Sequence, residues 1–200
     1  IVDNPAAGRE NVAQVDVGGG KACAVTTAGQ AKCWAGGDTP ILLAGAPQGI
    51  AKVSLSSQSS TDFSCLLASG SVYCWGNSVG DGTSATQSTP VRITGLPPGA
   101  TDIFVSYNRA CALVGLFAWC WRDYGFGGVT GVPASGPYPA TLAPVAFTAL
   151  GTSVTDITMN NAGACALNTA GATSCWGSNL TGNLGNSNGL NTRTLYPVQQ

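Results

Sequence analysis

The chain has 200 residues, a net charge of −1, eight Lys plus Arg, nine Asp plus Glu and no histidine. Charged residues make up only 8% of the sequence, whereas they make up about 25% of an average soluble domain. The few basic residues are scattered, so nucleic acid is not an expected partner. The absence of histidine removes the usual catalytic groupings and the commonest metal ligand, so the sequence predicts neither an enzyme nor a bound cofactor.

Four similar stretches follow one another along the chain, with a period of about fifty residues. Each begins with a short apolar segment, at residues 15–17, 53–55, 103–105 and 157–159. Two further strand-like runs follow, and each stretch closes with a segment led by or containing a proline: Pro40, Pro90, Pro144 and Pro197. We therefore predict a single domain over residues 1–200, with repeats at approximately 12–46, 47–96, 97–150 and 151–200.

All eight cysteines fall into four pairs, nine or ten residues apart, and a tryptophan follows the second cysteine of each pair. A β-hairpin places residues at this separation opposite each other, at the Cα distance that a disulfide requires. Zinc sites instead use C-x2-C spacing, usually together with histidine. We predict one disulfide within each hairpin: Cys23–Cys33, Cys65–Cys74, Cys111–Cys120 and Cys165–Cys175.

Four short strands per repeat, punctuated by glycine turns, favour an all-β fold of the β-propeller type, with four blades of four antiparallel strands each. No window keeps the 3.6-residue period of a helix. The proline-containing segments are expected as the outermost strands, because proline in a sheet is confined to edges and first positions. The tryptophans after the cysteine pairs are expected to pack between blades: Trp34, Trp75, Trp121 and Trp176.

The connection between the third and fourth strands of each repeat varies in length. From the tryptophan to the proline it spans six residues in the first repeat but 15, 23 and 21 in the others. Equivalent loops of a propeller emerge on one face, and loops on a rigid scaffold usually carry recognition residues. The longest connection holds aromatic side chains among glycines and prolines, and we predict a binding loop there: Arg122, Asp123, Tyr124, Phe126 and Tyr138.

Asp81, Asp102 and Asp156 are the carboxylates that we consider for calcium binding or for acid–base catalysis. The sequence around Asp81 lacks the alternating acidic residues and the closing glutamate of a calcium loop. Asp102 and Asp156 each precede an apolar segment within Thr-Asp-Ile. We expect all three to make hydrogen bonds within turns and connections, and a glycosidase-type pair is the less favoured alternative.

The second repeat carries the most complete motif, at residues 65–67, 72–77, 80–83 and 89–91, and the fourth repeat matches it at 165–167, 175–179 and 182–185. This pattern resembles the repeat of the regulator of chromosome condensation family, and the cysteine pairs resemble its extracellular branch. The resemblance implies a propeller, commonly seven-bladed. Because this chain has four repeats, three arrangements stay open: a four-bladed ring, an open arc completed by another chain, and part of a longer protein. Nucleotide exchange and chromatin binding are not carried over.

Eight pairable cysteines predict an oxidising compartment, so we expect a protein that is secreted or at the cell surface. The sequence contains no run of 18 apolar residues, so we do not expect insertion into a membrane. Asn179 lies in a glycosylation sequon, which is used only in a eukaryotic secretory route. We expect a non-enzymatic structural or adhesive module that binds other protein chains, above all copies of itself. The alternative is a carbohydrate-binding propeller that uses the long loops.

Overall fold

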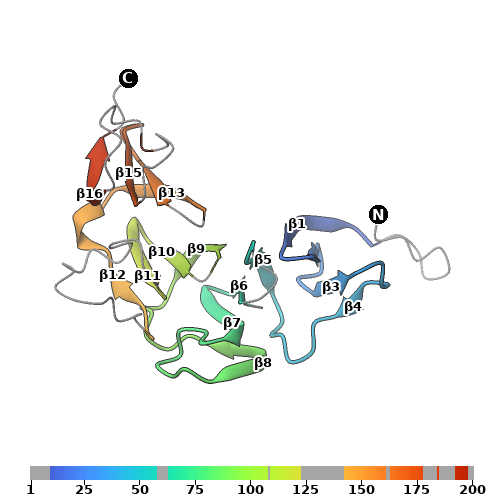
Figure 1. Ribbon diagram of the computed structural model, residues 1–200. Helices are drawn as coiled ribbons and strands as arrows, with labels where there is room; N and C mark the ends of the chain where they lie inside the picture. Colours follow the sequence, from blue (N-terminus) through green and yellow to red (C-terminus); the bar gives the residue numbers. More distant parts are fainter. Residues whose placement is uncertain are drawn as a thin grey trace.

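The computed structural model describes residues 10–57, 63–107, 109–122, 142–160, 163–177, 184 and 192–197. Over these residues the chain forms four antiparallel sheets of four strands each, and its helical content is one 3-10 turn, η1 (Thr148–Leu150). Each sheet uses four strands that are consecutive in the sequence (Figure 1). The prediction of an all-β chain with four four-stranded blades is therefore confirmed.

We name the sheets blades 1 to 4 in chain order. Blade 1 contains β1 (Val12–Gly18), β2 (Lys21–Thr26), β3 (Ala31–Ala35) and β4 (Ile41–Leu42). Blade 2 contains β5 (Ile50–Leu55), β6 (Ser64–Ala68), β7 (Ser71–Asn77) and β8 (Thr86–Arg92). Blade 3 contains β9 (Ala100–Ser106), β10 (Arg109–Val114), β11 (Phe117–Trp121) and β12 (Val145–Ala146). Blade 4 contains β13 (Val154–Met159), β14 (Gly163–Asn168), β15 (Thr173–Gly177) and β16 (Thr192–Pro197). The predicted boundaries of the four repeats, and the prediction that residues 1–200 form a single domain, stay predictions.

Each central hairpin is closed by the predicted disulfide. The two cysteines of a pair face each other across the second and third strands of their blade. Their Cα atoms lie 4.0–4.1 Å apart. The four predicted pairings, which leave no cysteine free, are thus confirmed: Cys23–Cys33, Cys65–Cys74, Cys111–Cys120 and Cys165–Cys175.

The fourth strand of each blade lies at the outer edge of its sheet, where the prolines were expected. Two of these strands, β8 and β16, begin several residues before their prolines, Pro90 and Pro197. β8 begins at Thr86, ahead of Pro90, because β7 continues past a bulge and pairs Gly76 with Gln87 and Asn77 with Thr86. In blade 2 the chain returns along this extension, so that β8 has seven residues, whereas β4 of blade 1 has two.

Side chains alternate between the two faces of each blade, and the blades pack face to face. We call the face directed at the preceding blade the leading face, and the face directed at the following blade the trailing face. Val53 and Leu66 on the leading face of blade 2 join the core that contains Val25 of blade 1. Cys65 and Leu67, on its trailing face, join the core that contains Ile103 of blade 3. The disulfides therefore lie on trailing faces; those of blades 1 to 3 belong to the cores between blades, whereas that of blade 4 lies on the open end of the arc.

The tryptophans that follow the cysteine pairs lie on leading faces. Trp121 and Trp176 are 1% and 0% exposed and belong to the cores between blades 2 and 3 and between blades 3 and 4. The ring of Phe147 meets that of Trp176 edge-on at 5.0 Å. Trp75 is only half-buried in the core between blades 1 and 2. Trp34 occupies the same position in blade 1, where no described blade precedes it.

The four blades form an open arc and do not close into a ring. Blade 1 and blade 4 lie at the two ends of the arc, with blades 2 and 3 between them (Figure 1). Of the three arrangements that the repeat number left open, the compact four-bladed ring is not formed. Each end of the arc therefore presents one blade face that is not covered by another described blade.

Candidate functional site

The predicted binding loop is described only at its first residue. Arg122 is 4% exposed, has a φ of 57°, and holds its guanidinium 4.6 Å from the centroid of the Phe63 ring. Because Phe63 belongs to the core between blades 2 and 3, Arg122 packs within that interface. Asp123, Tyr124, Phe126 and Tyr138 lie outside the described residues, as does Asn179. The binding loop stays a prediction.

The open leading face of blade 1 carries exposed apolar residues at positions that are buried elsewhere in the repeat. Strand pairing aligns Val15 with Val53, Ile103 and Ile157 of the next three blades. Those three side chains are 0%, 0% and 2% exposed, whereas Val15 is 62% exposed. Val17 is 73% exposed, and its counterpart Leu55 is 5% exposed. Blade 1 thus retains the contact residues of an interior blade.

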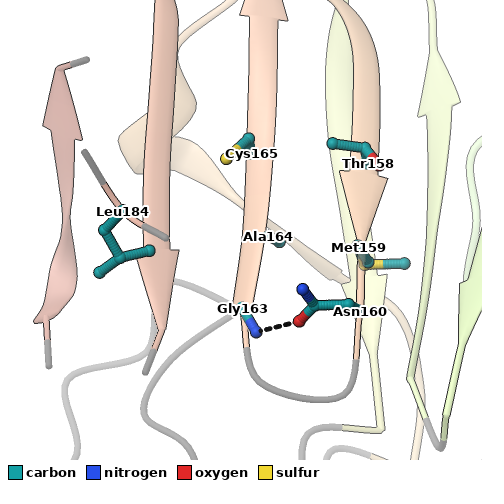
Figure 2. A pocket seen from close by; sticks show the side chains of 7 residues that line it. All are labelled: Thr158, Met159, Asn160, Gly163, Ala164, Cys165 and Leu184. Carbon is teal, nitrogen blue, oxygen red and sulfur yellow. Dashed lines mark hydrogen bonds between the residues drawn. The ribbon is translucent and has the colours of Figure 1, made fainter. Parts of the chain in front are cut away.

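The open trailing face of blade 4 shows the same contrast. Leu167 is 38% exposed, whereas Leu67 and Leu113 at the equivalent positions are 6% and 3% exposed. Cys165 is half-buried, although the equivalent cysteines of blades 1 to 3 are at most 2% exposed. A shallow cavity of about 100 Å³ adjoins this face. Figure 2 shows that its walls include Thr158 and Cys165, beside the hydrogen bond from the Gly163 amide to Asn160 Oδ1.

Polar side chains on trailing faces hold the next blade through its backbone. The Gln14 amide donates to the Val53 carbonyl and accepts from the Val53 amide, both at 3.0 Å. Asp16 Oδ2 accepts from the Leu55 amide at 2.7 Å, and Ser54 of blade 2 accepts from the Val105 amide at 3.0 Å. Thr158 occupies the position of Asp16 and Ser54 in blade 4, where it is exposed. The trailing end therefore offers an exposed hydroxyl at the position where Asp16 and Ser54 accept a hydrogen bond from a backbone amide of the next blade.

The carboxylates predicted to serve turns and connections do so. Asp102 accepts a hydrogen bond from its neighbour Ile103 at 2.7 Å and pairs with Lys52 of blade 2 at 2.5 Å. Asp156 accepts from the Ile157 amide at 2.8 Å. Asp81 accepts from the backbone and hydroxyl of Thr83 at 3.0 and 2.8 Å. Each contact fixes local backbone or joins two blades.

The Asp81 carboxyl also receives a hydrogen bond from Gln87 Nε2 at 2.8 Å. Burial by itself raises the pKa of this group, but the hydrogen bonds donated by Thr83 and Gln87 outweigh it and hold the pKa below its ordinary value. The ionised form of Asp81 is therefore the form that organises the connection between β7 and β8.

Among the described residues, no cluster of three or more His, Cys, Asp or Glu is arranged to hold a metal ion. In that same part of the chain, no helix has the length and hydrophobicity needed to cross a bilayer. Four disulfides are consistent with an extracellular protein. An open arc implies two uncovered sheet edges or blade faces, but the sequence did not single out the exposed apolar residues Val15, Val17 and Leu167 on them.

The fold is shared with solved propellers at low sequence identity. Human WBSCR16 superposes with a TM-score of 0.74 at 20% identity, covering 96% of this chain and 54% of that one. A chain in the structure of Kap60 bound to yeast RCC1 (Prp20) gives a TM-score of 0.77 at 14% identity, with 96% and 50% covered. Prp20p from Saccharomyces cerevisiae gives 0.75 at 12% identity, with 96% and 51% covered.

The present chain spans about half the length of these solved structures. No family model and no curated protein matches its sequence. The similarity therefore rests on structure, and it agrees with the repeat motif at residues 65–91 and 165–185. The chain has the β-propeller fold of RCC1-like repeats, present here as an open arc of four disulfide-closed blades.

Proposed function

We propose that the chain is a non-enzymatic extracellular scaffold whose two open ends associate head to tail with other copies of itself, forming a structural or adhesive assembly. The observation that carries the proposal is the exposure of Val15, Val17 and Leu167 at positions whose counterparts are buried between blades. Burial of such side chains is the main favourable term in association. The open faces thus have the composition of a blade interface.

The two ends differ from each other, which sets the geometry of association. A leading face packs against a trailing face at every interface within the chain. By the same rule, blade 1 of one copy meets blade 4 of another, a heterologous contact that gives a closed ring or an open fibre. The net charge of −1 keeps repulsion between copies low. The polar Lys32–Glu10 pair, at 2.6 Å, is the charged feature described at the leading end.

Solved structures of the same fold support protein partners in general. Kap60 is bound to yeast RCC1 (Prp20) in one of them, and another describes binding of Prp20p to Gsp1p and histones. For the present chain we carry over only the use of the fold to bind proteins. The sparse charge of this chain and its four disulfides argue against an intracellular partner that is recognised through charged loops.

Light scattering coupled to size-exclusion chromatography tests the proposal. The mass of the wild-type chain is expected to rise with concentration, and Val17→Asp is expected to stay monomeric, because it places a charge at the contact. Leu116→Asp is the matched control, since Leu116 is 44% exposed in the β10–β11 turn, away from both ends. A wild-type monomer at high concentration, or equal association of Val17→Asp, would contradict the proposal.

The carbohydrate-binding alternative depends on Tyr124, Phe126 and Tyr138, and no observation among the described residues favours it. Glycan-array binding that disappears when these three residues are replaced would establish it. N-glycosylation at Asn179 depends on the secretory route and likewise stays a prediction.

A further inference from the structure

The interface between blades 2 and 3 shows how a peptide loop covers the tryptophan of a leading face. Trp121 Nε1 donates a hydrogen bond to the Val79 carbonyl at 2.9 Å, and Val79 is 0% exposed. Gly80 follows with a φ of 101°, and a Cβ at that position would lie 2.3 Å from Trp121 Cδ1 and Nε1. A buried apolar residue followed by glycine is therefore the sequence that this indole accepts.

Blade 1 lacks the equivalent loop. Its connection from Trp34 to Pro40 spans six residues, against 15 in blade 2. Trp75 is the counterpart of Trp121, but it is only half-buried. Within the part of the chain that the structure describes, its Nε1 has no hydrogen-bond partner comparable to the Val79 carbonyl. The donor and the indole surface that blade 2 covers at Trp121 are thus uncovered at Trp75.

A groove of about 530 Å³ lies at this place. Trp75 forms one wall and the blade 1 residues Cys33, Ile41 and Leu43 contribute to the other. Ile41 is 67% exposed although it is a large apolar side chain. The groove continues the core between blades 1 and 2, which contains Trp75, Cys33 and Leu43 at its margin. It is therefore an unfinished part of an established interface.

We propose that this groove binds a peptide segment of a partner protein, in which a small apolar residue followed by glycine places its carbonyl on Trp75 Nε1. The Val79–Gly80 contact with Trp121 supplies the template. The groove is lined by one positive and one negative side chain, Lys21 and Asp38, so it favours a segment without strong net charge. Its other walls are mainly aliphatic and aromatic, which suits a peptide better than the many hydroxyls of a sugar.

The test uses the full chain and a capped synthetic peptide with the sequence of residues 77–84, which contains the template. We expect a saturable shift of the Trp75 indole N–H resonance, assigned by its loss in Trp75→Phe. A fluorescently labelled copy of the peptide reports affinity by anisotropy. Trp75→Phe removes the donor while keeping an aromatic ring, and it is expected to weaken binding about threefold to tenfold. Trp119→Phe in blade 3 is the matched control and is expected to bind as the wild type does.

A second peptide carrying Gly80→Val tests the requirement for glycine and is expected not to bind. The proposal is overturned if the Trp75 resonance does not move at millimolar peptide, if the Gly80→Val peptide binds equally well, or if Trp75→Phe leaves the affinity unchanged. It is also overturned if an oligosaccharide shifts the Trp75 resonance and the peptide does not. Because Trp34, on the leading face of blade 1, also lines the groove, the titrations are made at a chain concentration where the protein is monomeric, so that their outcome does not depend on self-association.

Discussion

A residue has little freedom to change where the backbone of one blade touches an aromatic ring of the next. Gly80 is such a residue, because the Trp121 ring occupies the space that a side chain at position 80 would need. Gly82, two residues later, also has a positive φ, of 91°, but a Cβ there would meet no atom within 4 Å. The two glycines therefore separate the effect of backbone conformation from that of close packing.

We expect Gly80→Ala to lower the free energy of unfolding by about 2–4 kcal/mol, since conformational strain and overpacking both act. Gly82→Ala is expected to cost about 1 kcal/mol, because the conformational term acts alone. Urea unfolding with the disulfides intact measures both. Equal losses in the two variants would mean that the contact with Trp121 is not limiting.

Among structural elements, the β7–β8 connection owes its shape to one carboxylate. Asp81 accepts hydrogen bonds from Thr83 and Gln87, and these hold its pKa below the ordinary value of 3.8. A carboxyl whose pKa is lower in the folded state stabilises that state above the unfolded pKa and loses its effect as the pH falls through the folded pKa.

We therefore expect wild type to be more stable than Asp81→Ala at pH 7, with a difference that shrinks as the pH falls below about 4. Thermal unfolding of both proteins between pH 7 and pH 2 measures this difference. Asp38→Ala, which alters a carboxylate in the blade 1 connection, serves as the control. A difference that grows on acidification would contradict the assignment of Asp81.

Over the whole molecule, features that depend on residues close in the sequence could be predicted, whereas features that depend on how blades are placed relative to one another could not. The hairpins and disulfides were predictable because Cys65 and Cys74 are close in sequence and their pairing is local. The packing of Trp121 between blades followed from its fixed place beside a cysteine. The open arc did not follow, because closure depends on the angles between blades. The groove at Trp75 was not found either: the six-residue connection was visible, but its effect appears only once blades 1 and 2 are in register.

The open arc also predicts that the same charged substitution has different effects on stability at equivalent positions of different blades. Val17→Asp is expected to change the stability of the monomer by less than about 1 kcal/mol, because the side chain is 73% exposed. Leu55→Asp, at the equivalent position of blade 2, buries an unpaired charge and is expected to cost at least about 3 kcal/mol. Unfolding at a concentration below that of association gives both values. Similar losses would show that the leading face of blade 1 is covered in solution.

The direction in which the disulfides point has a practical consequence. Cys65–Cys74 and Cys111–Cys120 are enclosed between blades, with all four residues 0% exposed, whereas Cys33 and Cys165 are half-buried. Because thiol–disulfide exchange requires access to a sulfur, a mild reductant is expected to open the first and last bridges before the two central ones. Alkylation followed by mass spectrometry measures the order, and simultaneous opening of all four would contradict it.

Cys33 lies in the groove beside Trp75, and Cys165 lies on the trailing end of the arc. A bound peptide should slow reduction of the first bridge only, and contact with a second copy should slow reduction of the last bridge only. Each of the two proposed contact surfaces therefore contains a disulfide whose rate of reduction reports whether that surface is covered. A single time course of reduction measures both rates.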